Sequence, residues 1–298
     1  DHAFKIKPHK KEDHGMKTTR RKFLKYSGLA AGASLLTGPS ETLAGLPQPD
    51  PSDKTGMLID STRCIGCQAC ERACAEQNGL PAPTEKPEAG VIRTPDDDAL
   101  TVVGQYETDK GNIFKKIQCM HCDQPACVSA CITNAMYKTE EGPVIWRENK
   151  CMGCRYCMLA CPFDIPKFEY ESLNPRIMKC TMCFDRQLEG QQPACVEACP
   201  QEAILFGKRG DLLDVAKKRI YDNPSEYVNH IYGEHEVGGT NVLYLSSVPQ
   251  EQIGFRTDLG TTPYPEYTKT FLYSVPLVLF LAPAFMVGLR RATRKEEE

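Results

Sequence analysis

The chain has sixteen cysteines, and their spacing is that of metal ligands rather than of disulfide partners. They fall into four groups of four, with none left over. The groups are Cys64, Cys67, Cys70 and Cys74; Cys119, Cys122, Cys127 and Cys131; Cys151, Cys154, Cys157 and Cys161; and Cys180, Cys183, Cys195 and Cys199. The first and third groups are spaced x2, x2 and x3, whereas the second is spaced x2, x4 and x3 and the fourth x2, x11 and x3. Every group therefore keeps an opening x2 pair and a closing x3 step.

This spacing is typical of cysteines that hold cubane [4Fe-4S] clusters. In the run from Cys151 to Pro162, three thiolates are close enough to bind one cluster from a single tight loop, which leaves one iron without a ligand. The fourth cysteine lies too far round to fill that position, and in ferredoxin runs of this form it serves a second cluster. Four motifs therefore predict two exchanging pairs and four [4Fe-4S] clusters, which would make the chain an electron carrier.

Zinc and disulfides are the two alternatives for so many cysteines. Zinc also takes four thiolates, but structural zinc sites usually draw two ligand pairs from separate loops, whereas here a tight triplet recurs with x2 spacing. Disulfides are common in exported proteins, yet sixteen cysteines at metal spacing in 298 residues do not resemble a small stapled scaffold. All sixteen ligand positions are cysteine, so nothing indicates a three-iron or a histidine-ligated cluster. A zinc-bound structural scaffold stays open as a function of another class.

Composition limits the remaining function classes. The net charge of -3 provides no basic field for nucleic acid, so nucleic-acid binding is not expected. The hydrophobic content of 41% is ordinary, but residues 57–207 are rich in Cys, Pro and Gly and contain only short apolar runs. We therefore expect the clusters to supply part of the core, and we expect the metal-free form not to fold.

The elements that position the cysteines are expected to be short. Apolar, β-prone runs precede the first three motifs and follow the fourth. They are residues 57–59, 114–117, 144–146 and 204–206. The resulting order of strand, ligand loop, short helix and strand repeats along the chain. It predicts an α+β fold of tandem bacterial-ferredoxin-like domains over residues 56–207.

Two segments interrupt or follow this four-cluster domain. Residues 75–113 form an acidic, proline-rich insertion with a run from Asp96 to Asp98, and we expect a surface loop there. Residues 208–268 follow as a docking extension, with a helix expected over residues 211–222 and a strand over residues 241–248. Residues 233–240 are too polar and glycine-rich to be assigned to an element.

The N-terminal region has the features of a twin-arginine export signal over residues 16–44. Arg20 and Arg21 precede a mild Gly/Ala-rich apolar stretch that ends at Leu36, and a small-residue cleavage site is predicted near Ala44. The apolar stretch is shorter than the roughly 20 residues that span a bilayer, which argues against an anchor. Residues 1–15 are interpreted as an N-terminal extension. The three histidines within it are not expected to form a metal site. They are His2, His9 and His14.

The C-terminal region predicts a single transmembrane helix over residues 270–289. The run from Phe271 to Leu289 has no charged side chain and as a helix would span about 28 Å, close to a bilayer core of about 30 Å. Pro276 and Pro283 are expected to kink it slightly, which indicates neighbouring helices. Residues 290–298 form a basic tail, which the positive-inside rule assigns to the cytoplasm and which leaves the preceding domain on the periplasmic side.

The block from Gln118 to Tyr170 resembles the four-cluster ferredoxin-like subunits of anaerobic respiratory complexes. The segments that carry this resemblance are residues 119–122, 125–127, 153–157 and 160–163. Together with the export signal, the opening from Gly56 to Cys70, the stretch 232–243 and the terminal anchor, they resemble the iron-sulfur subunits of hydrogenase-2-type uptake [NiFe] hydrogenases. One departure is that Ala75 and Ile132 stand where the ferredoxin pattern often has proline, and we expect it to affect loop rigidity more than ligation.

The resemblance implies which cysteines share a cluster, by pairing the first motif with the fourth and the second with the third. Cluster A would have Cys64, Cys67, Cys70 and Cys199; cluster B Cys180, Cys183, Cys195 and Cys74; cluster C Cys119, Cys122, Cys127 and Cys161; and cluster D Cys151, Cys154, Cys157 and Cys131. The sequence alone does not fix this pairing.

The resemblance also implies a function without catalysis by this chain itself. The chain would accept electrons from the small and large subunits of a periplasmic hydrogenase and pass them to a multi-helix, quinone-reactive membrane subunit. The same relay in a molybdopterin oxidoreductase complex of the formate, polysulfide or sulfite type is the alternative.

Four side chains near the ligand loops are candidates for tuning cluster potentials. Arg155, Lys167 and Lys179 would raise the potentials if they lie close, whereas as solvated surface charges they would not. His121 lies between two ligands, and it either donates to a cluster sulfur or is merely packed or solvent-facing.

Overall fold

The computed structural model describes residues 50–293. These residues belong to one compact unit. The predicted extension and export signal over residues 1–44, and the end of the basic tail over residues 294–298, lie outside the described residues.

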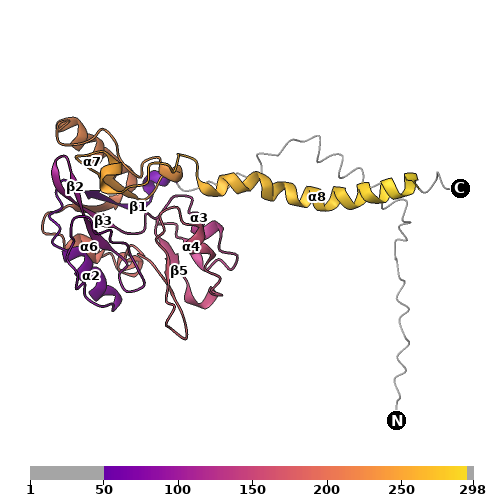
Figure 1. The fold of residues 1–298 in the computed structure, drawn as a ribbon, viewed down its shortest axis with the longest axis horizontal. Helices are drawn as coiled ribbons and strands as arrows, with labels where there is room; N and C mark the ends of the chain where they lie inside the picture. The colour runs from indigo at the N-terminus through magenta and orange to yellow at the C-terminus, as the bar shows by residue number, and fades with distance from the viewer. Residues whose placement is uncertain (1–49, 294–298) are drawn as a thin grey trace, which may run out of the picture. The chain divides into compact units, whose positions relative to one another are not determined.

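Around the cysteine motifs the described residues form short strands and helices, as the spacing of the motifs predicts, and two longer helices follow (Figure 1). In chain order they are η2 (Pro51–Asp53), β1 (Thr55–Asp60), α2 (Ala69–Asn78), β2 (Val102–Thr108), β3 (Gly111–Ile117), α3 (Ala126–Ser129), β4 (Met136–Lys138), β5 (Val144–Trp146), η3 (Glu148–Lys150), α4 (Tyr156–Ala160), β6 (Lys167–Phe168), β7 (Ile177–Met178), α5 (Phe184–Leu188), α6 (Ala194–Glu197), β8 (Ile204–Lys208), α7 (Arg209–Asp222), η4 (Glu236–Gly238), β9 (Val242–Leu245), η5 (Gln250–Ile253) and α8 (Tyr264–Thr293).

The central sheet has the strand order β8-β1-β9, and it joins the beginning of the four-motif region to its end. Strand β1 pairs antiparallel with β8 and parallel with β9. Its side chains alternate between two cores: Met57 and Ile59 pack with Cys70 and Cys195, whereas Leu58 packs against Leu212 of α7. Both faces of β1 are therefore covered, which explains why its run is continuously apolar rather than alternating. In Figure 1, α7 lies above β1, while α2 and α6 lie below it.

The four predicted strand runs and the two elements predicted in the docking extension are confirmed. Residues 57–59, 114–117, 144–146 and 204–206 lie in β1, β3, β5 and β8. The expected helix over residues 211–222 is the greater part of α7, and the expected strand over residues 241–248 is β9 with its flanks. The short pairs β4-β5 and β6-β7 flank the second and third motifs.

The insertion over residues 75–113 is not simply a surface loop, and that expectation needs correction. Helix α2 continues into the insertion as far as Asn78. The last part of the insertion forms β2 and the beginning of β3, which pair as an antiparallel hairpin. Val103 of β2 is buried against the core that contains Met57 and Ile59. The β-prone residues 100–103 follow one residue after the acidic run, and this short segment is the signal that the composition of the whole insertion obscured.

Helix α8 is the one helix among residues 50–293 that is long and apolar enough to cross a membrane, judged by length and composition. The candidate span is Tyr264–Arg290, with a mean hydropathy of 2.1, and it contains the predicted segment 270–289. Its apolar side chains are exposed, and Pro276 and Pro283 lie inside the helix. The helix begins seven residues before the predicted run at Phe271 and contacts α3.

Candidate metal centres

The ligand loops are built from residues with positive φ, which turn the backbone so that successive cysteines face one centre. In the first motif Gly66 and Gln68 have φ of 70° and 57°, and in the third Gly153 and Arg155 have 71° and 58°. The two motifs with identical spacing therefore have the same turn at the same positions. The fourth motif uses Met182 with φ of 58° in its opening pair.

Two of the expected ligand sets each line one small cavity. The thiols of Cys64, Cys67, Cys70 and Cys199, here called site A, line a cavity of ≈ 20 Å³ together with Lys116. Coulomb interactions with Cys199 and Cys67 are among the influences that raise the pKa of Cys64, after burial. Cys199 is more than a hundred residues from the rest of the set, so the fold brings the first and fourth motifs together at this point.

Site D comprises the thiols of Cys131, Cys151, Cys154 and Cys157, which line a second cavity of ≈ 20 Å³. Burial and then the thiols of Cys131, Cys151 and Cys154 raise the pKa of Cys157 to about 11. Cys154 is exposed, as Cys67 is in site A. Sites A and D therefore each present one ligand loop to solvent.

The remaining eight thiols form two more groups, in which no cysteine is exposed. In site B, Cys74 is influenced by Cys180, Cys195 and Cys183. In site C, Cys122 is influenced by Cys161, Cys119 and Cys127. In both cases burial is the largest cause and raises the pKa of the thiol.

The closing cysteines accept hydrogen bonds from a turn that follows them. The backbone N–H of Ala135 lies 3.1 Å from Cys131 Sγ, and that of Ala203 lies 3.3 Å from Cys199 Sγ. The residues three positions after Cys131, Cys161 and Cys199 have positive φ of 55°, 50° and 47°. The turn after Cys131 is therefore the same as the turns after the other two cysteines, although Ile132 stands where they have Pro162 and Pro200.

Cys74 differs from the other closing cysteines because α2 continues past it. Its sulfur lies 3.6 Å from Asn78 Nδ2, one helical turn later. At this motif, where Ala75 stands in place of the usual proline, the group near the cysteine sulfur is the Asn78 side-chain amide. At Cys131 and Cys199 the donors are backbone N–H groups. The loss of proline thus alters the local conformation at Cys74 but not at Cys131.

The four sites lie in a row, because cysteines of neighbouring sites pack in the same buried clusters. Cys70 packs in one cluster with Cys195, Cys180 in another with Cys119, and Cys127 in a third with Cys157. Cys195 of site B raises the pKa of Cys70 in site A, after burial. Cys119 of site C does the same for Cys180 in site B. Cys157 of site D does so for Cys127 in site C. The order along the row is therefore A, B, C and D.

Burial makes these thiols poor acids in the absence of metal. It raises the pKa of Cys70, Cys127 and Cys180 to about 12, and that of Cys161 to about 11. Metal ligation requires thiolates, so cations at these positions must displace the protons. None of the sixteen cysteines forms a disulfide, and no three His, Cys, Asp or Glu side chains within residues 50–293 are grouped to hold a single metal ion.

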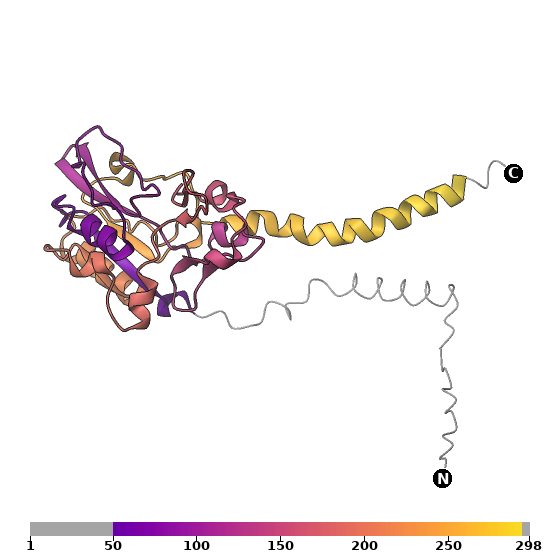
Figure 2. The same ribbon diagram turned by 90° about the horizontal axis from the view of Figure 1, so that it is seen from below.

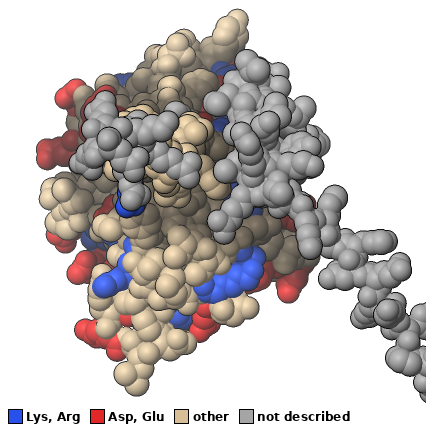
Figure 3. Space-filling view, turned by 90° about the vertical axis from the view of Figure 1, so that its right-hand side faces the viewer, with Lys and Arg blue, Asp and Glu red and all other residues tan. Residues whose placement is uncertain are grey.

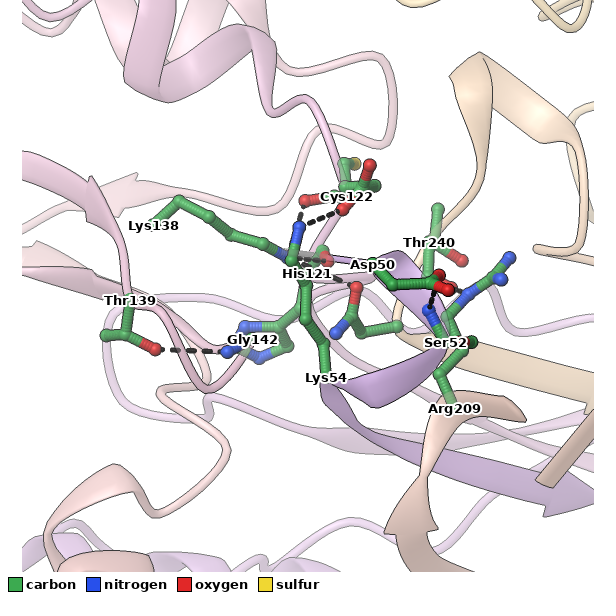
Figure 4. Close-up of polar contacts among 12 residues, drawn as sticks. Asp50, Ser52, Lys54, His121, Cys122, Lys138, Thr139, Gly142, Arg209 and Thr240 are labelled. Atoms are coloured by element: carbon green, nitrogen blue, oxygen red, sulfur yellow. Dashed lines mark hydrogen bonds and ion pairs between the residues drawn. The ribbon is translucent and has the colours of Figure 1, made fainter. Parts of the chain in front are cut away.

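Buried or half-buried lysines lie beside sites A to C, and sequence reasoning missed two of them. Lys116 on β3 lies near Cys70, Cys180 and Cys195, and its ammonium donates to Gln118 Oε1. Lys138 donates to the backbone oxygens of His121 at 3.0 Å and Cys122 at 2.9 Å (Figure 4). The paired Lys115 and Lys116 inside an otherwise apolar strand are the signal that could have directed attention to β3.

The structure shows how exposed three of the four candidate tuning residues are. Lys179 is buried and donates to Val144 O and, at 2.8 Å, to Cys180 O, so the solvated interpretation is wrong for it. Arg155 is exposed and lies over the rings of Phe168 and Tyr170. Lys167 forms an ion pair of 2.8 Å with Asp164 at the surface.

His121 is fully buried, so the solvent-facing interpretation is wrong as well. Its Nδ1 accepts a hydrogen bond of 2.8 Å from the backbone N–H of Val144. Burial, and then the nearby charges of Lys179 and Lys138, lower its pKa, which leaves the ring neutral with its proton on Nε2.

Two buried N–H groups beside the cysteines have no hydrogen-bond partner among the described residues. They are His121 Nε2, in the loop that joins Cys119 to Cys122, and Trp146 Nε1, on a side chain that lines the cavity of site D. Buried donors are rarely left unpaired. Cluster sulfurs accept such hydrogen bonds, so these orphaned donors and the four thiol sets fit [4Fe-4S] clusters.

Comparison with known proteins agrees with this chemistry. A family model described as a 4Fe-4S dicluster domain matches residues 111–209. A protein of Nitratidesulfovibrio vulgaris is 44% identical over 94% of this chain and 78% of its own length. The hydrogenase-2 operon protein HybA of Escherichia coli O157:H7 is 34% identical over 93% of this chain and 96% of its own. The formate dehydrogenase-O iron-sulfur subunit of Escherichia coli K12 is 37% identical over 66% and 68%.

Proposed function

This chain belongs to the family of 4Fe-4S electron-transfer subunits that includes the hydrogenase-2 operon protein HybA, and we propose that it relays electrons from a [NiFe] hydrogenase to a quinone-reactive membrane subunit. The relative named for the hydrogenase-2 operon matches over nearly its whole length, whereas the formate dehydrogenase subunit matches over about two thirds. This difference in coverage favours hydrogenase as the source of electrons.

We propose four clusters, held by the thiols of sites A, B, C and D as grouped above. The two cavities lined by complete sets of four thiols support this assignment most directly. Bound clusters would supply one-electron redox chemistry. The chain contributes the thiolates, the backbone and side-chain N–H donors, and an interior that excludes water from Cys70, Cys127 and Cys180.

The row of sites is the single observation that carries the relay. Neighbouring sites are linked by interacting thiols at each border, from Cys70 and Cys195 to Cys127 and Cys157. Only sites A and D expose a ligand loop, at Cys67 and Cys154. Electrons would therefore enter and leave through the two ends of the row, where a partner can approach closely.

The surface over α3 and α4 suits a partner that docks beside site D. Ile132, Met152, Tyr156 and Leu159 are exposed there, close in sequence to site D ligands. Figure 3 shows this side of the body as mostly uncharged, with acidic side chains mainly at the rim and a group of Lys or Arg side chains within its lower half. Because α3 also contacts α8, we assign this end to the membrane subunit and site A to the hydrogenase.

The proposed topology places the cysteine-containing body on the periplasmic side of the inner membrane. Helix α8 would be the anchor, and the basic residues that begin at Arg290 would stay in the cytoplasm. The twin-arginine pair at Arg20 and Arg21 would direct export of the folded protein, which suits a chain whose clusters must be inserted first.

Co-purification of the full chain from solubilised membranes tests the proposal. Hydrogenase subunits identified by mass spectrometry, together with hydrogen-dependent quinone reduction that is lost when the chain is deleted, are the expected result. Recovery of a formate dehydrogenase with formate-dependent quinone reduction would replace hydrogenase by the alternative source. A zinc-loaded, redox-silent chain would refute the relay in either complex.

A further inference from the structure

Strand β3 pairs with β2 in a hairpin at the end of the body away from α8 (Figure 2). It carries two adjacent lysines whose side chains are both buried but have different surroundings. Successive residues of a strand point to opposite faces, so the two amines enter separate parts of the core. Lys115 Nζ lies 4.7 Å from the ring centre of Tyr106 and 4.1 Å from that of Phe255. Lys116 lines the cavity of site A and interacts with thiols of two sites.

Lys116 stands at the border between sites A and B. The thiols that influence it most are Cys195 and Cys180 of site B and Cys70 of site A. Lys116 also lines the site A cavity together with Cys64, Cys67, Cys70 and Cys199, so a cluster bound there would lie beside its side chain.

The surroundings hold the ammonium in place. It donates to Gln118 Oε1, and Gln118 Nε2 in turn lies 3.3 Å from Met57 Sδ. The backbone oxygen of Lys116 accepts a hydrogen bond of 2.9 Å from the Tyr244 hydroxyl. Three elements, β1, β3 and β9, thus fix the position of this charge.

We propose that Lys116 is a fixed positive charge shared by sites A and B, which raises the reduction potentials of both and thereby sets the first step of the relay. This inference rests on the proposed function, because it requires clusters at sites A and B. Each electron that a site receives adds one negative charge. A buried cation stabilises that added charge more strongly than a solvated one, since the interior screens it less.

At site D, no lysine is among the groups that influence the Cys157 thiol most. Cys157 is influenced chiefly by the three other thiols of its own site. Arg155, the cation in its ligand loop, is exposed and lies over Phe168 and Tyr170. Removal of the Lys116 charge should therefore act on sites A and B and leave site D unchanged.

The test is a redox titration of the full chain, followed by electron paramagnetic resonance, with Lys116→Met, Lys116→Gln and Lys116→Arg. Loss of signals in Cys67→Ser, Cys183→Ser and Cys154→Ser assigns sites A, B and D. Lys115→Met is the matched control, because it removes the neighbouring buried amine from the same strand. Iron content is measured for every variant.

We expect the two neutral variants to make reduction of sites A and B at least tenfold less favourable, a fall of about 59 mV for one electron. Lys116→Arg should keep potentials near the wild-type values, and Lys115→Met should not move them. Unchanged potentials at A and B in an iron-replete neutral variant would overturn the inference. So would loss of iron from both neutral variants but not from Lys116→Arg, since that result assigns Lys116 to cluster assembly. A wild-type chain without iron would instead refute the proposed function.

Discussion

At the scale of single residues, the chemistry of the sites depends on a few buried polar atoms. The cysteines could be identified from the sequence because their spacing is local. The surroundings of His121, Lys116 and Lys179 could not, because burial depends on strands that pair only in the folded chain. Trp146 was missed for the same reason: it lies on β5, which was predicted only as an apolar run, and nothing in that run shows that its side chain lines the cavity of site D.

Trp146→Phe tests whether the orphaned indole donates to the cluster at site D. The phenyl ring keeps most of the apolar contact but removes the buried N–H group. A sulfur that loses a hydrogen bond holds an added electron less well, so the site D potential should fall while that of site A is unchanged. A redox titration of both signals checks this, and an unmoved site D potential would show that Nε1 has another role.

Lys115 should make stability depend on pH. Burial lowers its pKa to about 7, whereas in the unfolded chain the pKa is about 10.4. Between these values the unfolded state binds the proton that the folded state lacks, so stability rises with pH across that window. Between pH 7 and pH 9 the increase should be on the order of 2 kcal/mol.

Thermal denaturation of wild type and Lys115→Met at several pH values measures this effect. The variant lacks the titrating amine, so its advantage over wild type should be largest near pH 7 and should shrink towards pH 9. A difference between the two proteins that is constant with pH would argue against a neutral, buried Lys115.

At the scale of elements, the ligand loops could be predicted as repeated units but not as equivalent ones. Gly66 and Gly153 occupy the same position in the first and third motifs, with nearly equal φ. Their neighbours differ, because the hairpin formed by β2 and β3 brings the Phe114 ring against the first loop. A Cβ at Gly66 would lie 2.4 Å from that ring, whereas the nearest atom to a Cβ at Gly153 is 4.0 Å away, in Phe168.

Gly66→Ala should therefore destabilise site A much more than Gly153→Ala destabilises site D. Both variants strain a positive φ by a similar amount, of order 1 kcal/mol, but only the first must also displace an aromatic ring. Iron content and the site-assigned resonance signals after purification give the comparison. Gly79→Ala, at φ of 63° with open space, is a control for backbone strain alone. Equal cluster loss in both loop variants would contradict the packing argument.

At the scale of the whole molecule, the sequence predicted the arrangement of motifs but not what joins them. Strands β8, β1 and β9 close the first and fourth motifs into one body, and β9 comes from the extension that we expected only to dock onto partners. The hairpin formed from the insertion completes that core through Val103. Long-range pairings of this kind leave no local pattern, which is why the fold class was predictable and its closure was not.

Removal of iron should unfold the body around the four sites. The thiols of Cys70, Cys127 and Cys180 are buried, and the short ligand loops have little secondary structure of their own. Anaerobic chelation should therefore abolish near-ultraviolet circular dichroism and expose residues 56–207 to proteolysis. A metal-free chain that keeps native dichroism and protease resistance would show that packing alone holds the fold.

The most direct test of the central claim is the iron and acid-labile sulfide content of the full chain, purified without oxygen. Four thiol sets arranged in a row predict about sixteen iron atoms and about sixteen sulfides per chain, all in [4Fe-4S] form by Mössbauer spectroscopy. Zinc in place of iron, or a complete preparation with only about eight iron atoms per chain, would contradict the four-site relay.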